Sequence, residues 1–193
     1  MTTLEEKQIE KTTAILDASL KLFSENGFHA TPMSLIASTA NVGAGTIYRY
    51  YKNKDDLINE LYKKTKKKMI DYVSVGFEED TSLKDVFYRI WARTIEFCVN
   101  NPKEILFLEQ FANTPFISTE TKNEILTFFE PLHELYANAV KNKEVEDIPI
   151  DIIKASLQGT TVTLFKMSMA GDLELTHELI KQSFETFWKG IKK

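Results

Sequence analysis

The 193-residue sequence contains a single cysteine, Cys98, and no long apolar run. One cysteine excludes an internal disulfide, and its place in an apolar helical pattern predicts buried packing rather than redox chemistry. No run approaches the length of a membrane-spanning helix, and the N-terminal residues lack the apolar core of a signal peptide. We therefore expect a cytoplasmic protein that does not associate with a membrane.

The sequence also lacks the apolar and polar alternation of β-strands, and it has no Asn-Gly hairpin turn. Catalytic and metal-binding signatures are missing as well. His133-Glu134 and His177-Glu178 each begin like a zinc-protease helix, but neither has the second histidine that such a site needs. There is no complete dinucleotide loop, G-x-S-x-G elbow or Cys-His signature. These absences predict an all-α protein that is not an enzyme and uses no metal or cofactor.

Composition and charge indicate a folded chain with an uneven charge distribution. Apolar residues make up 43% and charged residues 27%, so the chain can bury a sizeable core. Residues 1–75 carry 11 Lys and Arg against 9 Asp and Glu, a net charge of +2. Residues 76–193 carry 13 against 19, a net charge of −6. The N-terminal part is therefore the better candidate for contact with an anionic partner such as DNA.

Residues 31–54 predict two short helices separated by a tight turn. Thr31 is expected to cap the first helix with its hydroxyl, and the proline that follows it suits the first helical position. Residues 41–43 supply the turn, and the second helix spans about residues 44–50. In this second helix Ile47 points inward, whereas its neighbours carry hydroxyls, phenols and a guanidinium instead of an apolar stripe.

Such a pair of helices is typical of a helix-turn-helix element, whose second helix enters the major groove of DNA. The N-terminus of the first helix and nearby hydroxyls can hold a phosphate, and a lysine beyond the second helix can neutralise another. We expect DNA contacts from Thr31, Ser34, Gly43, Ala44, Thr46, Tyr48, Arg49, Tyr50 and Lys54.

Several of these positions follow a recurrent pattern: G-[FY]-x-x-[TS], then A-x-x-A-x-V, then G-T-[LI]-Y-x-[YH]-[FY]-x-[NS]-K. The pattern is held here by Gly27-Phe28, Thr31, Ala37, Ala40, Val42, Gly45-Thr46-Ile47-Tyr48, Tyr50-Tyr51 and Asn53-Lys54. With these residues, the first sixty positions resemble the N-terminal domain of TetR/AcrR-type bacterial transcriptional regulators. One departure is that Gly43 and Ala44 stand where the family often has Ser followed by Lys, Arg or Gln. A long base-reading side chain is therefore missing, which leaves direct readout to Ala44, Tyr48, Arg49 and Tyr50.

About nine helices are expected in all, and proline at position 131 should bend or interrupt the one over residues 118–142. Helical patterns also cover about residues 6–26, 31–40, 44–50, 54–75, 82–100, 102–114, 149–170 and 176–189. We predict a DNA-binding domain over residues 1–53, a connecting helix over residues 54–75, and an effector-binding and dimerisation domain over residues 76–193.

The resemblance implies a small-molecule pocket in the C-terminal domain. The surplus of aromatic residues there permits such a pocket, with a few polar side chains to orient the ligand, although each aromatic residue also fits plain core packing. The candidate lining residues are Phe87, Trp91, Thr94, Gln110, Phe111, Phe129, His133, Tyr136, Gln158, Thr161 and Phe165.

The last two predicted helices have features of a dimer interface. The first has a face of small residues, and the second has an apolar stripe that is too wide for one neighbouring helix. A two-fold dimer that buries both would form a four-helix bundle, which is also how the family dimerises; a monomeric core is the alternative. The candidate interface residues are Ser156, Gly159, Thr160, Thr163, Ile180, Phe184, Phe187 and Trp188.

We predict a homodimeric, ligand-responsive regulator, a repressor that binds a palindromic double-stranded operator and is released by a small apolar effector. Two identical recognition helices, one from each subunit, explain why the operator is expected to be palindromic. The two half-sites must face the same side of the duplex, so they lie about one helical turn, or about 34–36 Å, apart. The main alternative is an all-α protein-interaction module that keeps the helix-turn-helix shape without sequence-specific DNA binding. Salt-dependent binding to duplex DNA would decide against that alternative. An enzyme that uses the aromatic cavity is a more distant possibility.

Overall fold

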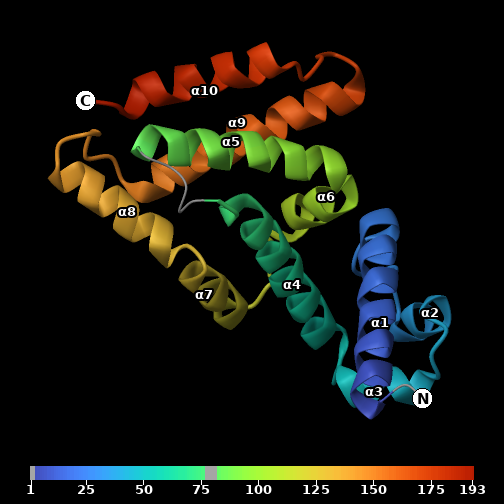
Figure 1. Cartoon of the computed structure of the whole chain (residues 1–193). Helices are drawn as coiled ribbons and strands as arrows, with labels where there is room; N and C mark the ends of the chain where they lie inside the picture. Colours follow the sequence, from blue (N-terminus) through green and yellow to red (C-terminus); the bar gives the residue numbers. More distant parts are fainter. Residues whose placement is uncertain (1–2, 77–81) are drawn as a thin grey trace. The chain divides into compact units, whose positions relative to one another are not determined.

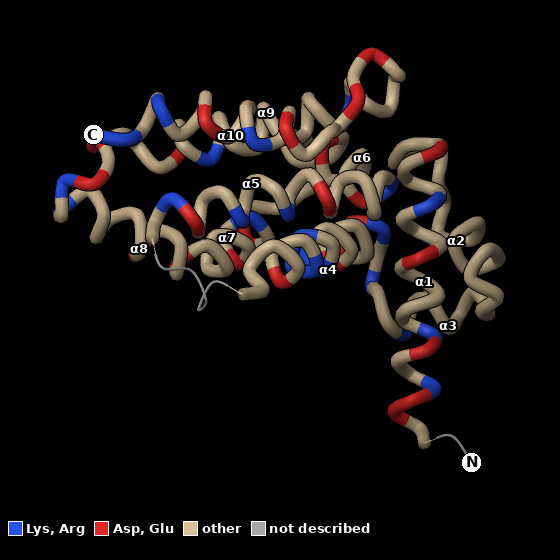
Figure 2. The backbone as a smooth tube through the Cα atoms, turned by 45° about the horizontal axis from the view of Figure 1, so that its top comes forward, with Lys and Arg blue, Asp and Glu red and all other residues tan. Residues whose placement is uncertain are grey.

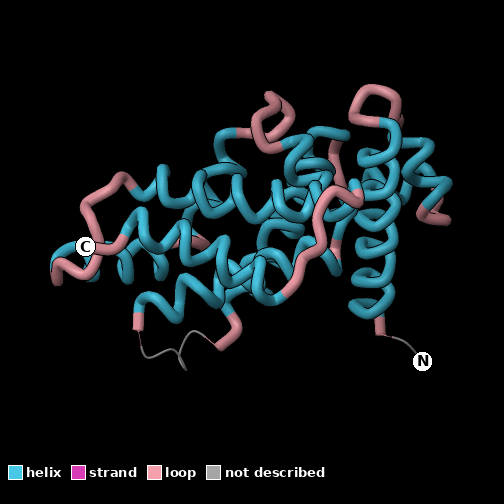
Figure 3. Tube along the Cα trace, turned by 90° about the horizontal axis from the view of Figure 1, so that it is seen from above, coloured by secondary structure: helices cyan, strands magenta, loops and turns pink. Residues whose placement is uncertain are grey.

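The computed structural model describes residues 3–76 and 82–193. Within these residues the chain forms ten α-helices and no strand, which confirms the predicted all-α class (Figures 1 and 3). The helices are α1 (Leu4–Asn26), α2 (Met33–Thr39), α3 (Ala44–Tyr50), α4 (Lys54–Ser74), α5 (Leu83–Asn100), α6 (Pro102–Phe111), α7 (Thr119–Thr127), α8 (Glu130–Lys141), α9 (Ile150–Ala170) and α10 (His177–Ile191). In the described residues no helix is both long and apolar enough to cross a bilayer.

Side-chain caps account for several helix starts. Thr3 and Glu6 form a reciprocal capping box at α1, so this helix begins earlier than the sequence pattern predicts. Asn53, Ser82 and Thr176 each accept a hydrogen bond from a backbone N–H in the first turn of α4, α5 and α10. These caps satisfy donors that have no partner within the helix, which is why short polar residues mark the starts so clearly.

The predicted helix over residues 118–142 is two helices in the structure. Helix α7 ends at Thr127, and α8 begins at Glu130 with Pro131 in its first turn. Proline has no N–H to donate, and its ring clashes with the carbonyl four residues earlier, so a continuous helix cannot pass through this position. The predicted interruption is confirmed, and it accounts for ten helices instead of nine.

The start of α2 differs from the prediction. Pro32 occupies the N-cap position, and no side chain caps the helix. The Thr31 hydroxyl instead donates to the carbonyls of Gly27, at 2.8 Å, and Leu22, at 3.3 Å. The last carbonyls of a helix have no partner within it, and Thr31 supplies a donor at the end of α1. This arrangement leaves Thr31 with 0% of its surface exposed.

The chain packs as two compact units. The first contains residues 1–66 and 103–125, and the second contains residues 67–102 and 126–193. The two units do not coincide with the domains predicted from the sequence. Helix α4 contributes to both units, and most of α6 belongs to the same unit as the N-terminal helices. The boundaries themselves remain a prediction.

The first unit is built on consecutive contacts of α1 with α2 and of α2 with α3. Aromatic side chains from α6 complete its core: the ring of Phe111 lies 6.1 Å from Phe23 and 5.1 Å from Phe107. All three rings are almost fully buried. Burial of this apolar surface supplies the main stabilisation for a unit whose helices α2 and α3 are too short to be stable alone.

Helix α5 is the centre of the second unit and contacts α8, α9 and α10. Its Phe87 and Trp91 are fully buried beside Phe184 of α10. The Trp91 indole N–H donates to the Ser183 hydroxyl at 2.9 Å, which satisfies the polar atom of this buried ring. Helix α5 and helix α10 are therefore fixed against each other by both packing and a directional bond.

Candidate nucleic-acid interface

Helix α3 coincides with the predicted recognition helix and presents a polar face to solvent. Its buried residue is Ile47, which anchors the helix, and Tyr51 just beyond it is also buried. Tyr48 is 56% exposed, and Arg49 is exposed. Among the described residues, no carboxylate lies within ion-pair distance of the Arg49 guanidinium. A large phenol and an uncompensated cation on one short helix are therefore available to an external partner.

Most of the predicted DNA-contact residues lie on the surface of α2 and α3. The exposed ones are Ser34, Gly43, Ala44, Tyr48 and Arg49, and the partly exposed ones are Thr46 and Tyr50. Their assignment to DNA contact stays a prediction. Thr31 is different, because its buried hydroxyl cannot reach a phosphate in this conformation, so its expected role at the DNA is wrong for this structure.

Lys54 also has a role within the chain that the sequence did not predict. Its ammonium donates to the Phe28 carbonyl at 2.7 Å and lies 4.2 Å from the centre of the Phe28 ring. This contact joins the start of α4 to the loop between α1 and α2. No local pattern could reveal the pair, since the two residues lie 26 positions apart in the sequence.

Gly45 belongs to the G-T-[LI]-Y motif but is not among the residues predicted to contact DNA. It is exposed on α3, and a Cβ atom built on it would meet no atom within 4 Å. Its backbone is not in the left-handed region either. Glycine in a helix is less stable than alanine by about 0.5–1 kcal/mol. Among the described residues, neither the space around Gly45 nor its backbone conformation requires a glycine.

Asn59 connects α4 to the loop before α7 by two hydrogen bonds. Its amide nitrogen donates to the Phe116 carbonyl at 2.8 Å, and its amide oxygen accepts from the Ser118 N–H at 2.8 Å. The Phe116 ring in turn stacks on Phe28, with 4.1 Å between ring centres. The start of α4, the loop before α7 and the loop after α1 therefore form one connected support within the first unit.

Tyr51 belongs to the same support. Burial raises the pKa of its phenol to about 12, and the nearby carboxylates of Glu60 and Asp56 add to this rise. Each of these effects disfavours the charged phenolate. The side chain therefore stays neutral at physiological pH and packs as an apolar anchor under α3.

The lysines of α4, drawn blue in Figure 2, gather in the middle of the helix. Lys63 pairs with Glu60 at 3.1 Å and with Glu124 at 2.9 Å, and Lys67 pairs with Asp71 at 2.7 Å. The hydrogen bonds that Lys63 donates to Glu124 and then to Glu60 raise the pKa of its ammonium. These charges are used within the chain, so the interface is better defined by α3 than by the lysine-rich part of α4.

The predicted ligand-binding residues fall into different environments. Gln110 and Phe111 lie in the first unit, where Phe111 is part of the aromatic core, and the other nine lie in the second. Phe87 and Trp91 fill the contact between α5 and α10. The Tyr136 hydroxyl holds the loop before α9. Phe87, Trp91, Phe111 and Tyr136 have core or loop-stabilising roles in the structure, and their contact with a ligand stays a prediction.

The Tyr136 hydroxyl forms several hydrogen bonds with the loop before α9. Its single O–H proton is shared between the carbonyls of Glu146 and Ile148, at 2.9 Å in each case, and its oxygen accepts from the Ile148 N–H at 3.2 Å. The same loop pairs with the end of α10, since the Glu146 N–H donates to the Ile191 carbonyl at 2.8 Å. The O–H proton of Tyr136 is therefore already engaged within the subunit.

His133 is the predicted ligand residue whose surroundings suggest a missing partner. Its Nε2 atom is buried, and among the described residues it has no hydrogen-bond partner. Buried polar side-chain atoms nearly always have a partner. Phe129, the N-cap residue of α8, is half-buried, and the ammonium of Lys154 lies 5.9 Å from its ring centre. Among the predicted ligand-binding residues, His133 at this part of α8 has the strongest structural support.

The predicted dimer residues divide between α9 and α10. On α9 all four are exposed, namely Ser156, Gly159, Thr160 and Thr163. On α10 Phe184 is only 1% exposed, whereas Ile180, Phe187 and Trp188 are partly exposed and pack against the same core. The apolar stripe of α10 contacts α5 and α9 within the subunit, and its part in a dimer interface stays a prediction. Phe184 in particular has no surface left to bury in a dimer.

A helix-turn-helix unit with an exposed second helix, joined to a larger all-helical unit, defines a helical DNA-binding regulator. Two family descriptions match the chain: "Bacterial regulatory proteins, tetR family" over residues 15–61, and "Tetracyclin repressor-like, C-terminal domain" over residues 82–192. The protein therefore belongs to the TetR family of bacterial transcriptional regulators.

Related proteins match nearly the whole chain. It is 25% identical over 180 residues to an uncharacterized HTH-type transcriptional regulator of Haemophilus influenzae, which covers 93% of this chain and 94% of the relative. A TetR family transcription regulator from Marinobacter aquaeolei has a TM-score of 0.93 at 19% identity, covering 98% and 100% of the two chains. FadR from Bacillus subtilis, solved with stearoyl-CoA, has a TM-score of 0.74 at 22% identity, covering 91% and 96%. These structural likenesses show a shared fold.

Proposed function

We propose that this protein is a ligand-responsive transcriptional repressor that binds a palindromic operator as a homodimer and leaves it when a small effector binds. The observation that carries the proposal is the exposed face of α3. In the part of the chain that the structure describes, no hydrogen bond or ion pair engages the exposed side chains of Tyr48 and Arg49, and the neighbouring Gly45 has open space at its Cβ position. Buried side chains position the helix from beneath, so that this face is preorganised for a groove of DNA.

On DNA, the residues of α3 divide the work by their chemistry. The Arg49 guanidinium can bind a guanine edge or a phosphate through two parallel hydrogen bonds. The Tyr48 and Thr46 hydroxyls suit phosphate or base contacts, and Ala44 suits the methyl group of thymine. Gly45 lets the backbone at the start of the helix come close to the DNA. This division fits a short operator half-site for each subunit.

The homodimer is proposed to form through one face of α9. Exposed residues recur there at intervals of three and four, so they lie along one side of the helix. They are Ile152, Ala155, Ser156, Gly159, Thr160, Thr163, Lys166, Met167 and Ala170. A single charge occurs in a face about 27 Å long at about 1.5 Å per residue. Small side chains allow two helices to approach closely, and a two-fold axis makes the same face serve both subunits.

The effector is proposed to be an acyl-CoA or a similar molecule with a long apolar chain. The support comes from FadR of Bacillus subtilis, a structural relative solved with stearoyl-CoA, and from the unsatisfied Nε2 of His133. An apolar chain fits the apolar interior of the second unit, and His133 would bond a polar atom of the ligand. To release DNA, the effector must bind the DNA-free state better, typically by about 1–3 kcal/mol of coupling free energy.

The DNA part of the proposal is tested by selecting bound fragments from a pool of random duplexes. The expected result is a palindromic consensus, bound with an affinity that falls linearly with salt on logarithmic axes. Arg49→Ala, which removes the cation from α3, should weaken this binding. Its matched control is Lys189→Ala, which removes a cation from α10 instead. If the chain showed no salt-dependent duplex binding, the protein-interaction module would become the better description.

The effector part is tested with stearoyl-CoA, using coenzyme A and stearate as controls. The selected duplex, labelled for fluorescence anisotropy, should be released by stearoyl-CoA more effectively than by either control. Binding should also raise the melting temperature in a concentration-dependent way. Duplex binding that is insensitive to every acyl chain tested would refute the effector class while leaving the DNA assignment intact.

A further inference from the structure

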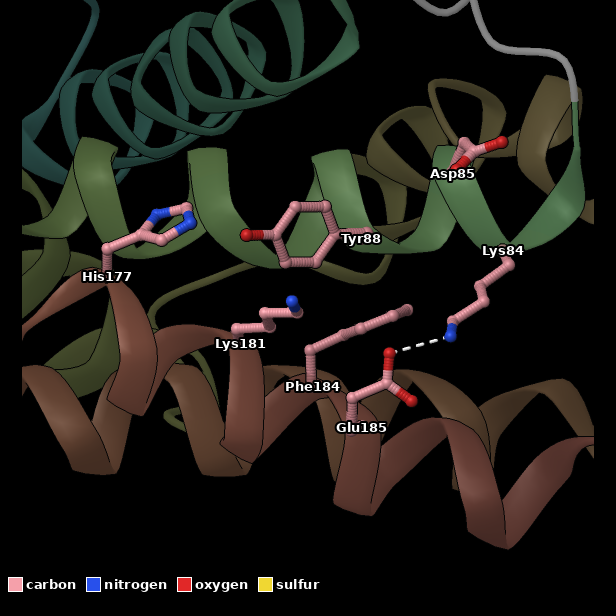
Figure 4. Close-up of a pocket in the computed structure, with 7 residues that line it drawn as sticks. All are labelled: Lys84, Asp85, Tyr88, His177, Lys181, Phe184 and Glu185. Atoms are coloured by element: carbon pink, nitrogen blue, oxygen red, sulfur yellow. Dashed lines mark ion pairs between the residues drawn. The ribbon is translucent and has the colours of Figure 1, made fainter.

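A groove of about 340 Å³ lies between the first turns of α5 and the first half of α10 in the second unit (Figure 4). Its residues come from these two helices only. None of them was predicted to bind a ligand, and Phe184 was predicted to lie at the dimer interface. The two ends of the groove differ in their chemistry, and an aromatic floor joins them. This difference is what indicates a specific kind of ligand.

Tyr88 and Phe184 form the floor of the groove. Their ring centres lie 5.1 Å apart, and the rings meet edge to face at 61°. Phe184 is almost fully buried, whereas Tyr88 is partly exposed. The exposed part of this pair offers a rigid apolar surface on which a flat ring can pack, and aromatic pairs of this geometry add to the energy of simple burial.

One end of the groove is electrically balanced. Lys84 and Glu185 form an ion pair at 2.6 Å there, drawn as a dashed line in Figure 4. The hydrogen bond from Lys84 lowers the pKa of the Glu185 carboxyl. Asp85, at the rim, interacts with the Ser82 hydroxyl at 2.5 Å. Each of these charged groups already has a partner, so this end closes the groove without attracting a further ion.

The other end gathers hydrogen-bond donors. The His177 imidazole, the Tyr88 hydroxyl and the Lys181 ammonium all point into this part of the groove (Figure 4). Within residues 3–76 and 82–193 no hydrogen bond or ion pair engages any of these three groups. Lys181 therefore contributes one positive charge that no carboxylate of the described residues neutralises by direct contact.

We propose that this groove binds a small aromatic carboxylate. The carboxylate would lie among Lys181, Tyr88 and His177, and its ring would pack on the Tyr88 and Phe184 floor. A single negative charge matches the single unpaired ammonium, and hydrogen bonds between ionised partners are about twice as strong as neutral ones. The volume lies at the lower end of the range for small-molecule sites, about 300–1,000 Å³, which suits a molecule with one or two rings.

The test is isothermal titration calorimetry of the full chain with benzoate, phenylacetate and indole-3-acetate. Each acid is paired with its neutral amide, which has nearly the same shape. At least one acid should bind, and its amide should bind at least about tenfold more weakly, since tenfold corresponds to about one charge-assisted hydrogen bond. Phenyl phosphate, a dianion, should bind more weakly than the best carboxylate.

Two variants and a matched control locate the binding. Lys181→Met keeps the aliphatic stem and should weaken the best acid about tenfold, and Tyr88→Phe keeps the ring and should weaken it about threefold or more. Lys189→Met makes the same charge change on α10 outside the groove and should leave affinity unchanged. The proposal is overturned if no acid binds at millimolar concentration, if acids and amides bind equally, if phenyl phosphate binds best, or if Lys181→Met and Lys189→Met behave alike.

Discussion

Replacing Gly45 with alanine is expected to stabilise the protein and weaken its binding to DNA. The added Cβ atom meets nothing within 4 Å in the subunit, and the backbone of this residue is not in the left-handed region. The change should therefore increase the free energy of unfolding by about 0.5–1 kcal/mol, because alanine loses less conformational entropy on folding and favours the helix. For a chain of this size the melting temperature should rise by about 1–4 °C.

The effect on DNA has the opposite sign if the start of α3 approaches the duplex closely. A methyl group that meets a phosphate or a base edge should lower the affinity for the selected operator by about tenfold, or about 1.4 kcal/mol. Gly190 provides a matched control. It is an exposed helical glycine of α10 with the same open space around its Cβ position. Gly190→Ala should give a similar stabilisation with unchanged DNA binding.

Both quantities are measured on the same protein preparations. Circular dichroism at fixed protein concentration gives the melting temperature, and fluorescence anisotropy with the selected duplex gives the affinity. A Gly45→Ala protein that is stabilised but binds DNA as tightly as the parent refutes the close approach at α3. A destabilised Gly45→Ala protein beside a stabilised Gly190→Ala protein refutes the structural part of the reasoning.

Five further substitutions test other parts of the structure and the proposals. Arg49→Ala should not reduce stability, but it should weaken operator binding by about 1–3 kcal/mol if the side chain contacts a base. If the side chain contacts a phosphate, the slope of log affinity against log salt should fall by about 1. Lys54→Ala should instead lower the free energy of unfolding by about 1–2 kcal/mol, because the contact with Phe28 is lost. Gly159→Leu should leave the subunit folded and shift dimers to monomers in sedimentation experiments, because the side chain occupies the proposed interface. His133→Leu should raise the free energy of unfolding, by up to about 1–3 kcal/mol, and reduce the effector response, since an unpaired buried nitrogen is removed. Tyr51→Phe should flatten the loss of stability at high pH. In the folded parent the pKa of this phenol is about 12, above its ordinary 10.0, so its contribution is complete below pH 10 and is lost as pH rises towards 12.

Each of these changes has an outcome that would contradict it. Equal stability of the Arg49 and Lys54 variants would mean that the Lys54 contact with Phe28 is not significant in solution. Unchanged sedimentation of Gly159→Leu would move the interface away from α9. A normal effector response in His133→Leu would reduce this histidine to a packing role. Identical stability curves above pH 10 for the parent and Tyr51→Phe would show that the phenol ionises equally in the folded and unfolded chain.

Much of the secondary structure could be predicted because its causes are local. Helix α3 covers residues 44–50 as expected, and α4 begins at Lys54 after the Asn53 cap. A cap or a proline acts on backbone groups within about one helical turn, so the sequence alone contains both partners. For the same reason Pro131 separated α7 from α8. The exposed, polar face of α3 could also be predicted from the sequence, because Ile47 is the residue of this helix that is suited to a buried position, and it is the one that the structure buries.

Contacts between residues that are distant in the sequence could not be predicted. Thr31 had the composition of a helix cap, but its hydroxyl bonds to the end of α1 and is buried there. Lys54 had the charge for a phosphate contact, which stays a prediction, but the sequence did not show that its ammonium also bonds to the Phe28 carbonyl. A single side chain offers several possible bonds of similar strength. Which of them forms depends on which groups the fold brings within about 3 Å.

The sequence by itself determined the all-α class, the approximate helices, the helix-turn-helix element and the family resemblance, because periodicity, caps and a local motif carry this information. The tertiary structure decided which polar groups remain available. It packed the apolar stripe of α10 against the core of the second unit and left the small-residue face of α9 exposed. It also gave the Nε2 of His133 no hydrogen-bond partner among residues 3–76 and 82–193. It also placed Tyr88 beside His177 and Lys181, which are far apart from it in the sequence. Availability is a property of packing, since a side chain is free for DNA, a ligand or a second subunit only when no other part of the chain has already bound it.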